Sequence, residues 1–343
     1  MVSKMETDVE RFIRTLPKAE LHMHLEGSLE PEMLFTLAER NGIKLRWPSV
    51  EALRAAYEFV NLEDFLALYF EGCRVLVTER DFYDVTAAYL NKAKEQAVHR
   101  AEIFIGPQSF TERVVPLAAI MDGVLGAMKD VGSRSGISTG FIVSVHRHRP
   151  LEDALTVLDA ISPWAEQLAG VGMGGPEVGH PPGKFRPYYL KAKALGYRTT
   201  VHAGEEGPPA YIREALDTLP IERIDHGVTA HTDEALMARL AKSQIPLTVC
   251  PLSNFRLKGV SSMKLHPLKK MLDRGLRVSV HSDDPPYFGG YVNENLIACW
   301  NALSLTVEDI AALARNSFTS SFAPADDVRR WLAAVDTHLE LLT

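Results

Sequence analysis

At 343 residues, with 46% hydrophobic and 24% charged side chains, the chain has ordinary globular composition and enough length for one large barrel or two smaller domains. Its net charge is −7 and its lysines and arginines are scattered, which argues against nucleic acid or a membrane surface as a partner. The three cysteines lie far apart, and the N-terminal stretch mixes apolar with charged residues. These features predict a cytoplasmic protein without disulfides, signal peptide or membrane span.

The chain begins with one helix, one strand and a long helical stretch. The first predicted helix, Asp8–Thr15, ends before Pro17, and the first strand follows at Ala19–Leu25. From Glu30 to about Ala97 the apolar residues recur at helical spacing. A stretch of this length is more than a connection between strands, so part of it is expected to cover something.

The rest of the chain alternates short apolar runs with amphipathic segments. The further predicted strands are Ala101–Ile105, Ser138–Val145, Leu168–Met173, Arg198–Ala203, Arg223–Val228, Pro246–Pro251 and Arg277–His281. The predicted helices between them are Val115–Lys129, Leu151–Ala165, Tyr188–Leu195, Tyr211–Leu219, Thr232–Lys242 and Leu265–Arg274, with a helical tail from Asn293.

This alternation predicts an α/β fold, a (β/α)8 TIM barrel, in which both faces of each strand are buried. We expect a single domain over 1–343, with a helical insert at roughly 30–97 after strand 1 and a helical C-terminal tail. A doubly wound open sheet is the alternative architecture. That fold needs a glycine-rich phosphate-binding turn after an early strand. Here the turn between the first strand and the following helix has only one glycine, Gly27.

Two histidines in the first strand indicate a metal site. His22 and His24 are two residues apart, so both imidazoles face one side of the strand, while Leu21 and Met23 face the other. Neutral imidazole is the commonest metal ligand, and two on one strand supply half of a zinc site. An isolated pair can be an accident, so the rest of the chain has to supply further ligands.

The carboxyl ends of other strands supply them, at the end of the barrel where reactive residues lie in such folds. Ionisable residues at these strand ends are His202, Glu205, Asp225, His226, Asp283 and Asp284. The opposite strand ends carry Arg198, Glu222, Pro246 and Arg277.

Each residue alone also has an ordinary interpretation. His202 could be a core histidine, and Asp283 and Asp284 could cap a helix that begins at Pro285. Glu205 could form a solvated pair with Glu206. The location of all of them at one end of one barrel favours a functional site.

Five ordered motifs, PKAELHMHLEGSLEP, TVHAGE, IDHG, CPLSN and HSDDP, span nearly the whole chain. In this order and spacing they resemble the adenosine and adenine deaminases of the metal-dependent amidohydrolase superfamily. The resemblance implies one Zn2+ per chain, held by His22, His24, His202 and Asp283. It further implies Glu205 as proton donor to the purine, His226 as the base that orients the water, and Asp284 as the partner of the base and a contact of the substrate.

The resemblance also implies a small-molecule purine substrate and a role in purine salvage. The loop GMGGPEVGHPPGKF aligns with the family segment whose backbone amide meets purine N3, which points to Gly175. Glu26 stands where adenosine deaminases typically have the aspartate that reaches ribose, and PPYFGGYV after Asp284 resembles the adenine deaminase branch. These departures favour a pocket for free adenine, which would be converted to hypoxanthine and ammonia, with Glu26 at its edge.

Other interpretations remain open. Adenosine or another adenine-containing metabolite could be the substrate of the same chemistry, and a barrel that keeps zinc only for binding is a third hypothesis. The intact set Glu205, His226 and Asp284 argues against the third. A second His-x-His pair, His146 and His148, is expected in a solvated loop beside arginines. The sequence leaves the oligomeric state open.

Overall fold

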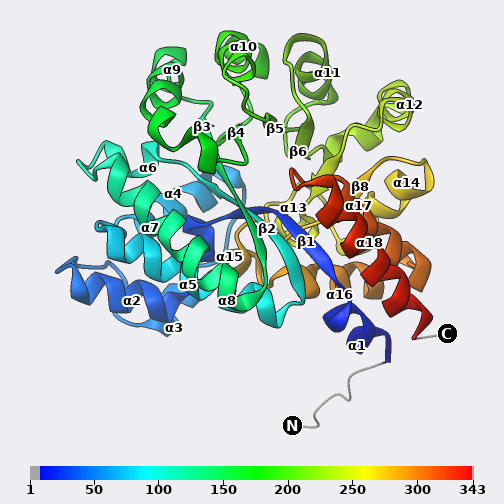
Figure 1. Ribbon diagram of the computed structural model, residues 1–343, viewed down its shortest axis with the longest axis horizontal. Helices are drawn as coiled ribbons and strands as arrows, with labels where there is room; N and C mark the ends of the chain where they lie inside the picture. The colour runs from blue at the N-terminus through cyan, green and yellow to red at the C-terminus, as the bar shows by residue number, and fades with distance from the viewer. Residues whose placement is uncertain (1–7, 342–343) are drawn as a thin grey trace.

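Eight parallel strands form the centre of the molecule in the computed structural model, which describes residues 8–341 (Figure 1). Residues 1–7, part of the N-terminal stretch in which the sequence predicts no signal peptide, lie outside the described residues. The strands are β1 (Lys18–His24), β2 (Val98–Ile105), β3 (Ser138–His146), β4 (Gly170–Gly174), β5 (Thr200–Ala203), β6 (Arg223–His226), β7 (Leu247–Val249) and β8 (Val278–Val280).

The strands run in the order β1-β2-β3-β4 and β5-β6-β7-β8, and two contacts close them into a barrel. At one junction Val171 pairs with Thr199, between β4 and β5. At the other, Met23 of β1 pairs with Asp283 just after β8. The amide of Asp283 donates to the carbonyl of His22 at 2.9 Å. The predicted (β/α)8 barrel is therefore confirmed, and its closing contact lies among the predicted metal ligands.

Helices cover the outside of the strands, as Figure 1 shows. Before β3 they are α1 (Asp8–Thr15), α2 (Pro31–Arg40), α3 (Val50–Ala55), α4 (Leu62–Cys73), α5 (Glu79–Glu95), α6 (Gln108–Thr111), α7 (Leu117–Ala127) and α8 (Ser133–Ser135). Between β3 and β8 they are α9 (Leu151–Ala160), α10 (Arg186–Ala194), α11 (Pro209–Thr218), α12 (Glu234–Ser243), α13 (Pro251–Arg256) and α14 (Leu268–Asp273). The C-terminal tail holds α15 (Pro285–Phe288), α16 (Val292–Leu303), α17 (Val307–Thr319) and α18 (Ala325–Glu340).

Proline accounts for two differences from the sequence prediction. The helix expected over Leu151–Ala165 ends at Ala160, and a separate 3-10 turn containing Pro163 follows it. The helix expected over Leu265–Arg274 begins only after Pro267. Proline has no N–H to donate and sterically disfavours helix in the preceding turn, so it fits only at a helix start. Most other boundaries differ from prediction by one to three residues.

The helical insert after β1 divides into two parts. Its last helix, α5, has one buried face and packs against α7, as an ordinary barrel helix does. Helix α4 instead lies over the carboxyl ends of the strands, where Leu62, Phe65 and Tyr69 border the main cavity. The Asn61 side chain accepts a hydrogen bond from the amide of Asp64 and so starts α4. The insert thus supplies one wall of the cavity.

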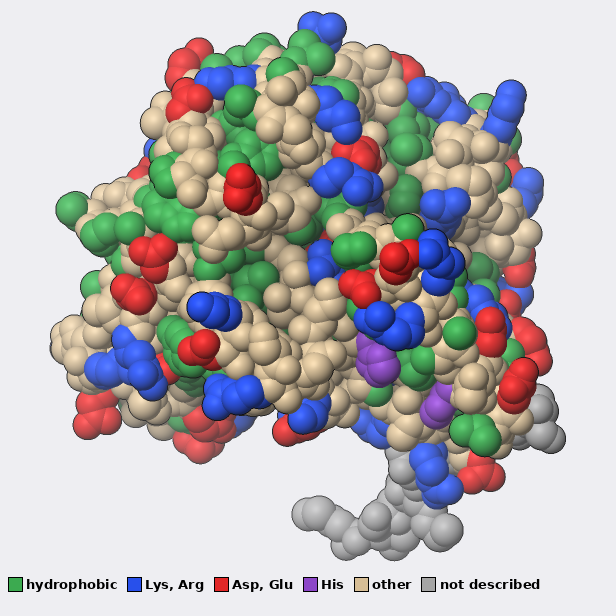
Figure 2. Space-filling view, in the orientation of Figure 1, with side chains coloured by type: hydrophobic (Ala, Val, Ile, Leu, Met, Phe, Trp, Pro, Cys, Tyr) green, Lys and Arg blue, Asp and Glu red, His purple; other side chains and the backbone are tan. Residues whose placement is uncertain are grey.

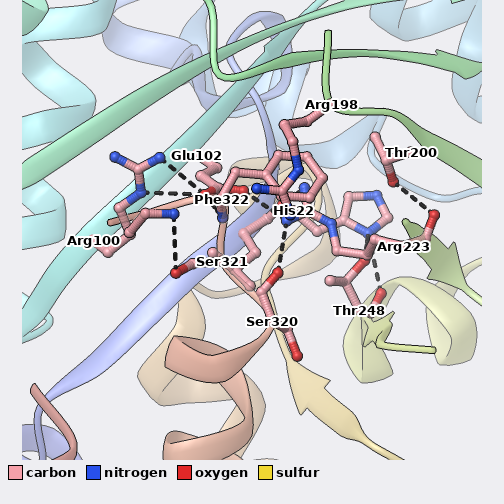
Figure 3. A network of polar contacts seen from close by, with 12 residues as sticks. His22, Arg100, Glu102, Arg198, Thr200, Arg223, Thr248, Ser320, Ser321 and Phe322 are labelled. Atoms are coloured by element: carbon pink, nitrogen blue, oxygen red, sulfur yellow. Dashed lines mark hydrogen bonds and ion pairs between the residues drawn. The ribbon is translucent and has the colours of Figure 1, made fainter. Parts of the chain in front are cut away.

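Inside the barrel, below the cavity, a carboxylate is held by two guanidinium groups (Figure 3). Glu102 of β2 accepts hydrogen bonds from Arg223 Nη1 at 2.6 Å and from Arg100 Nη2 at 3.0 Å. The amide of Phe322 donates to the same carboxylate at 2.6 Å. All three charged side chains are buried. We call Arg100, Glu102 and Arg223 the base cluster, because it lies toward the amino ends of the strands.

The surface carries mixed charge. On the face drawn in Figure 2, lysine and arginine side chains are interspersed with aspartate and glutamate. Among residues 8–341, none of the helices combines the length and the apolar character needed to cross a bilayer.

Candidate active site

One cavity opens at the carboxyl ends of the strands, and it collects most of the residues predicted for the site. The predicted residues that line it are His24, Gly175, His202, Glu205, His226, Asp283 and Asp284. Its other walls are Leu62, Phe65, Leu66, Tyr69 and Phe70 of α4, with Gly106, Ser144, His146 and Gly174. An apolar wall facing a few convergent polar groups is the usual construction of a small-molecule site.

Three imidazoles from two strands meet beside this cavity. The Nε2 atoms of His22 and His24 each lie 3.1 Å from Nε2 of His202. The alternation of β1 produces this arrangement, since Leu21 and Met23 are fully buried on the other side of the strand. Burial lowers the pKa of His22 to about 4 and that of His24 well below its usual value, so both rings are neutral and have a free lone pair.

Asp283 completes a four-atom cluster. Its Oδ1 lies 3.5 Å from Nε2 of His22 and 3.4 Å from Nε2 of His24. Four donor atoms around a zinc ion with bonds of ~2.0–2.1 Å are about 3.3 Å apart in tetrahedral geometry. The two spacings from His202 and the two from Asp283, 3.1–3.5 Å, lie near that value, so these residues fit a metal ion.

Contacts behind the imidazoles orient their metal-facing nitrogens. Nδ1 of His22 lies 3.1 Å from both the carbonyl and the hydroxyl oxygen of Thr248. Nδ1 of His202 lies 3.2 Å from a carboxylate oxygen of Asp225. A proton held at Nδ1 leaves the Nε2 lone pair unprotonated and aimed at the cluster, as in known metal sites.

A second group of possible ligand atoms shares part of this cluster. It consists of His22, His226, Cys250 and Asp283, whose ligand atoms all lie within 4.8 Å of one another. Burial and the charge of Asp283 raise the pKa of the Cys250 thiol well above its usual value. The Cys250 thiol would have to lose its proton to bind a metal, whereas the neutral imidazoles and the carboxylate need not, which favours the set with three imidazoles and one carboxylate.

Glu205 and His226 lie next to the cluster. Oε2 of Glu205 is 3.5 Å from Nε2 of His226, and both side chains are buried. Glu206, by contrast, is exposed, so the two glutamates are not a solvated pair. Burial and the carboxylates of Asp283 and Glu177 raise the pKa of Glu205 well above its usual value. Burial, aided by His22, lowers the pKa of His226. Glu205 is therefore suited to hold a proton, and His226 is suited to accept one.

Asp284 is also buried and turned toward the cavity. It occupies the N-cap position of α15, but its side chain makes no capping hydrogen bond there. Burial and the neighbouring Asp283 raise its pKa well above the usual value. A Cβ on Gly27 would lie only 1.7 Å from Oδ1 of Asp284, so glycine is required where the β1 turn passes this carboxyl. Because the Asp284 side chain makes no capping hydrogen bond, the interpretation of this residue as a helix cap is wrong.

Two of these residues have a backbone conformation that side chains other than glycine rarely adopt. His226 has φ 64° and Asp283 has φ 63°, both in the left-handed region. Strand β6 therefore ends at His226 instead of the predicted Val228. Such strain costs about 1–3 kcal/mol per residue and gathers at functional sites.

The two residues predicted to contact the substrate have different positions. Gly175 lines the cavity, and its φ of +92° requires glycine. Glu26 lies behind the wall, where its Oε1 accepts a hydrogen bond from the amide of Gly106 at 2.8 Å. Gly106 itself borders the cavity. Glu26 therefore acts on the cavity indirectly, by bonding the amide of a residue that borders it.

One sequence expectation was wrong, and two residues were missed. His146 lines the cavity instead of lying in a solvated loop, because β3 continues through it. The second histidine of that pair, His148, stacks on it with 5.4 Å between ring centroids. Glu177 and Arg147, both buried, were not predicted as site residues. Arg147 donates to the carbonyl of His202 at 2.7 Å. Glu177 lies in the loop GMGGPEVGHPPGKF, where the sequence pointed only to Gly175, and Arg147 lies outside the five motifs.

Comparisons with known proteins give a consistent result. A sequence model described as adenosine deaminase matches residues 17–338. An adenine deaminase from Rhodopseudomonas palustris is 57% identical over 333 residues, covering 97% of this chain and 97% of the relative. One from Ralstonia pickettii is 52% identical over 330 residues, covering 95% and 96%.

Solved structures agree in fold. The crystal structure of adenine deaminase from Arthrobacter aurescens matches with a TM-score of 0.93 and 46% identity, covering 95% of this chain and 99% of that one. An amidohydrolase from Burkholderia ambifaria with bound Zn matches with a TM-score of 0.91 and 28% identity, covering 100% and 95%.

Proposed function

The chain belongs to the adenosine deaminase family, and on that premise we propose that it hydrolyses adenine to hypoxanthine and ammonia. The observation that carries the proposal is that Glu205, His226 and Asp284 border one cavity with a four-atom ligand cluster. A metal site kept only for stability needs no buried acid and base beside it. The names of the similar proteins support adenine as the substrate.

The ligand cluster would hold one zinc ion per chain through His22, His24, His202 and Asp283. The neutral imidazoles and the 3.1–3.5 Å spacing of the donor atoms support this assignment. When bound, zinc supplies a nucleophile at neutral pH by lowering the pKa of water to about 7. The relative with bound Zn supports zinc over other metals.

Three side chains would then handle protons. Addition at C6 of the purine pushes electrons onto N1, so a proton has to reach N1. Glu205, whose pKa is raised by burial and by neighbouring carboxylates, would donate that proton. His226, neutral because its pKa is lowered, would take the proton of the attacking water. Asp284, whose pKa is also raised, would form a hydrogen bond with purine N7 or with the water.

The wall formed by α4 supports a free base in preference to a nucleoside. Phe65 of α4 packs against Phe288 with 4.7 Å between ring centroids and against Tyr287 with 5.4 Å. These contacts hold α4 on the PPYFGGYV segment and close that side of the cavity with aromatic rings. Glu26, bonded to the amide of Gly106, would fix the neighbouring wall. The amide of Gly175 would meet purine N3.

Ammonia release by zinc-loaded protein, measured with adenine and adenosine in parallel, tests the proposal. We expect adenine to be turned over with a kcat/KM at least about 100-fold above that of adenosine, a ratio that the loss of fit in a closed pocket produces readily. Preferred turnover of adenosine would show that the α4 wall admits ribose. Failure to release ammonia from either compound would favour a binding protein and overturn the proposal.

A further inference from the structure

Glu177, in the loop after β4, makes an unusual set of contacts with the segment that contains Glu205. Its Oε1 accepts a hydrogen bond from the amide of Gly204 at 2.7 Å. Its Oε2 accepts from the amides of Glu205 at 2.9 Å, Glu206 at 3.1 Å and Gly207 at 2.8 Å. Four successive backbone N–H groups therefore converge on one carboxylate, which is an acceptor-only group that matches such donors.

The segment 204–207 has the local sequence that this arrangement requires. Gly204 has φ +75°, a conformation that directs neighbouring amides to one side and that glycine adopts without strain. A Cβ on Gly207 would lie 2.6 Å from Cδ of Glu177, so only glycine permits this close approach. The two glycines that flank Glu205 and Glu206 thus fit the segment around the Glu177 carboxylate.

A buried arginine connects the same carboxylate to the rest of the site. Glu177 is 1% exposed, and Arg147 is fully buried beside it, with Nη1 at 3.9 Å from Oε1 of Glu177. The same Nη1 donates to the carbonyl of His202 at 2.7 Å. Arg147 Nε donates to the carbonyl of His180 at 2.9 Å. The loop after β4 and the loop after β5 are therefore bound to each other at the level of the site.

We propose that Glu177 is the positioning residue for Glu205, fixing the backbone from which the proton donor reaches the substrate. This inference rests on the proposed function, in which Glu205 delivers the proton. Glu177 lies in the same loop as Gly175, so its four hydrogen bonds also fix the position of the cavity wall near Gly175 relative to Glu205. A displacement of the acid by about 1 Å is enough to cost about 100-fold in rate.

Glu177→Gln tests the proposal, because it turns an N–H donor toward amides that need an acceptor. We expect kcat to fall about 10- to 100-fold with a smaller change in KM, the size seen for residues that orient others. Amide hydrogen exchange of the segment 204–207 should accelerate in this variant. Glu102→Gln is the matched control, since it alters an equally buried carboxylate that accepts a backbone amide in the base cluster. The control should leave exchange in 204–207 unchanged.

A double-mutant cycle separates positioning from general destabilisation. In the Glu205→Gln background, Glu177→Gln should change residual ammonia release by no more than about twofold, because the group that it positions is already lost. An equal loss in both backgrounds, or a kcat within about twofold of wild type for Glu177→Gln, would overturn the proposal.

Two further results separate a failure of the Glu177 proposal from a failure of the proposed function. If Glu177→Gln fails to fold, Glu177→Asp, which keeps the charge but shortens the reach, enters the same cycle with the same criteria. If Glu205→Gln turns over adenine like wild type, the acid assignment in the proposed function fails. Unchanged exchange in 204–207 would instead refute Glu177 alone.

Discussion

Buried charged side chains gather at two levels of the barrel, and the two clusters are built differently. In the base cluster, Glu102 is held by Arg100 and Arg223, so its negative charge is matched by positive charge. The second level is the rim, the carboxyl ends of the strands around the cavity. There the main charged neighbours that shift the pKa of Glu205 are other carboxylates, Asp283 and Glu177. The base is arranged to keep its carboxylate ionised, whereas the rim favours a protonated acid.

The backbone shows the same difference. His226 and Asp283 at the rim have left-handed conformations, and Asp284 has a buried carboxyl with no capping role. Strain and repulsion of this kind oppose folding, and proteins retain them where the chemistry of a site requires them. If the rim residues have the proposed roles in activity and the base cluster serves stability, substitutions at the two levels should have opposite effects on turnover and on unfolding free energy.

The largest effect is expected at the ligand cluster. His22→Ala removes one of three imidazoles, so zinc content and ammonia release should both fall to background. Metal analysis of the purified variant measures the first, and an ammonia assay with adenine the second. His148→Ala is the control, because His148 lies outside the cluster and should leave one zinc per chain. Full zinc occupancy in His22→Ala would contradict the ligand assignment.

The next effect concerns the base cluster. Glu102→Gln leaves Arg223 buried without its full counter-charge, so the free energy of unfolding should fall by about 3–5 kcal/mol. Urea unfolding measures this change. Turnover per folded molecule should stay within about twofold of wild type, because Arg223 keeps its 3.5 Å contact with Asp225 behind His202. A variant that unfolds like wild type would show that the base cluster does not stabilise the barrel.

The smallest effect is a pH dependence at Glu26, whose pKa burial raises to about 7 from a usual value near 4.5. The folded state therefore binds this proton more tightly than the unfolded state. The bound proton therefore contributes on the order of 3 kcal/mol to the free energy of unfolding at low pH. This contribution is lost as pH rises from about 4.5 to 7. Glu26→Gln should remove that loss, so the variant gains stability relative to wild type as pH rises.

Unfolding free energies of both proteins at pH 5 and pH 8 measure the Glu26 effect. Glu102 has the opposite sign: Arg223 and Arg100 outweigh burial and hold its pKa below the usual value. Its contribution is present at neutral pH and is lost as pH falls. If the difference between Glu26→Gln and wild type stayed constant between the two pH values, the Glu26 carboxyl would not be protonated by burial.

Much of the rim could be predicted from sequence because strand geometry is regular. The alternation that turns His22 and His24 to one side is a property of any strand, and the strand-end rule located His202 and Asp283. These predictions depend on local pattern plus one rule of the fold.

The remaining contacts depend on burial and on long-range pairing. Glu177 bonds backbone amides 27 to 30 residues away, and although TVHAGE marks part of that segment, nothing in the motif indicates a carboxylate partner for its amides. The base cluster joins Glu102 to an arginine 121 residues away, and a charged residue within a predicted strand gives no sign of such a partner. His146 was assigned to a loop because β3 was predicted one residue too short.

The most direct test of the division between rim and base is to measure turnover and unfolding free energy on one zinc-loaded sample of Glu205→Gln. We predict that adenine turnover falls by several orders of magnitude while stability equals or exceeds that of wild type, because a neutral amide replaces a carboxyl buried beside other carboxylates. Retained turnover, or a loss of stability comparable to that of Glu102→Gln, would contradict the account.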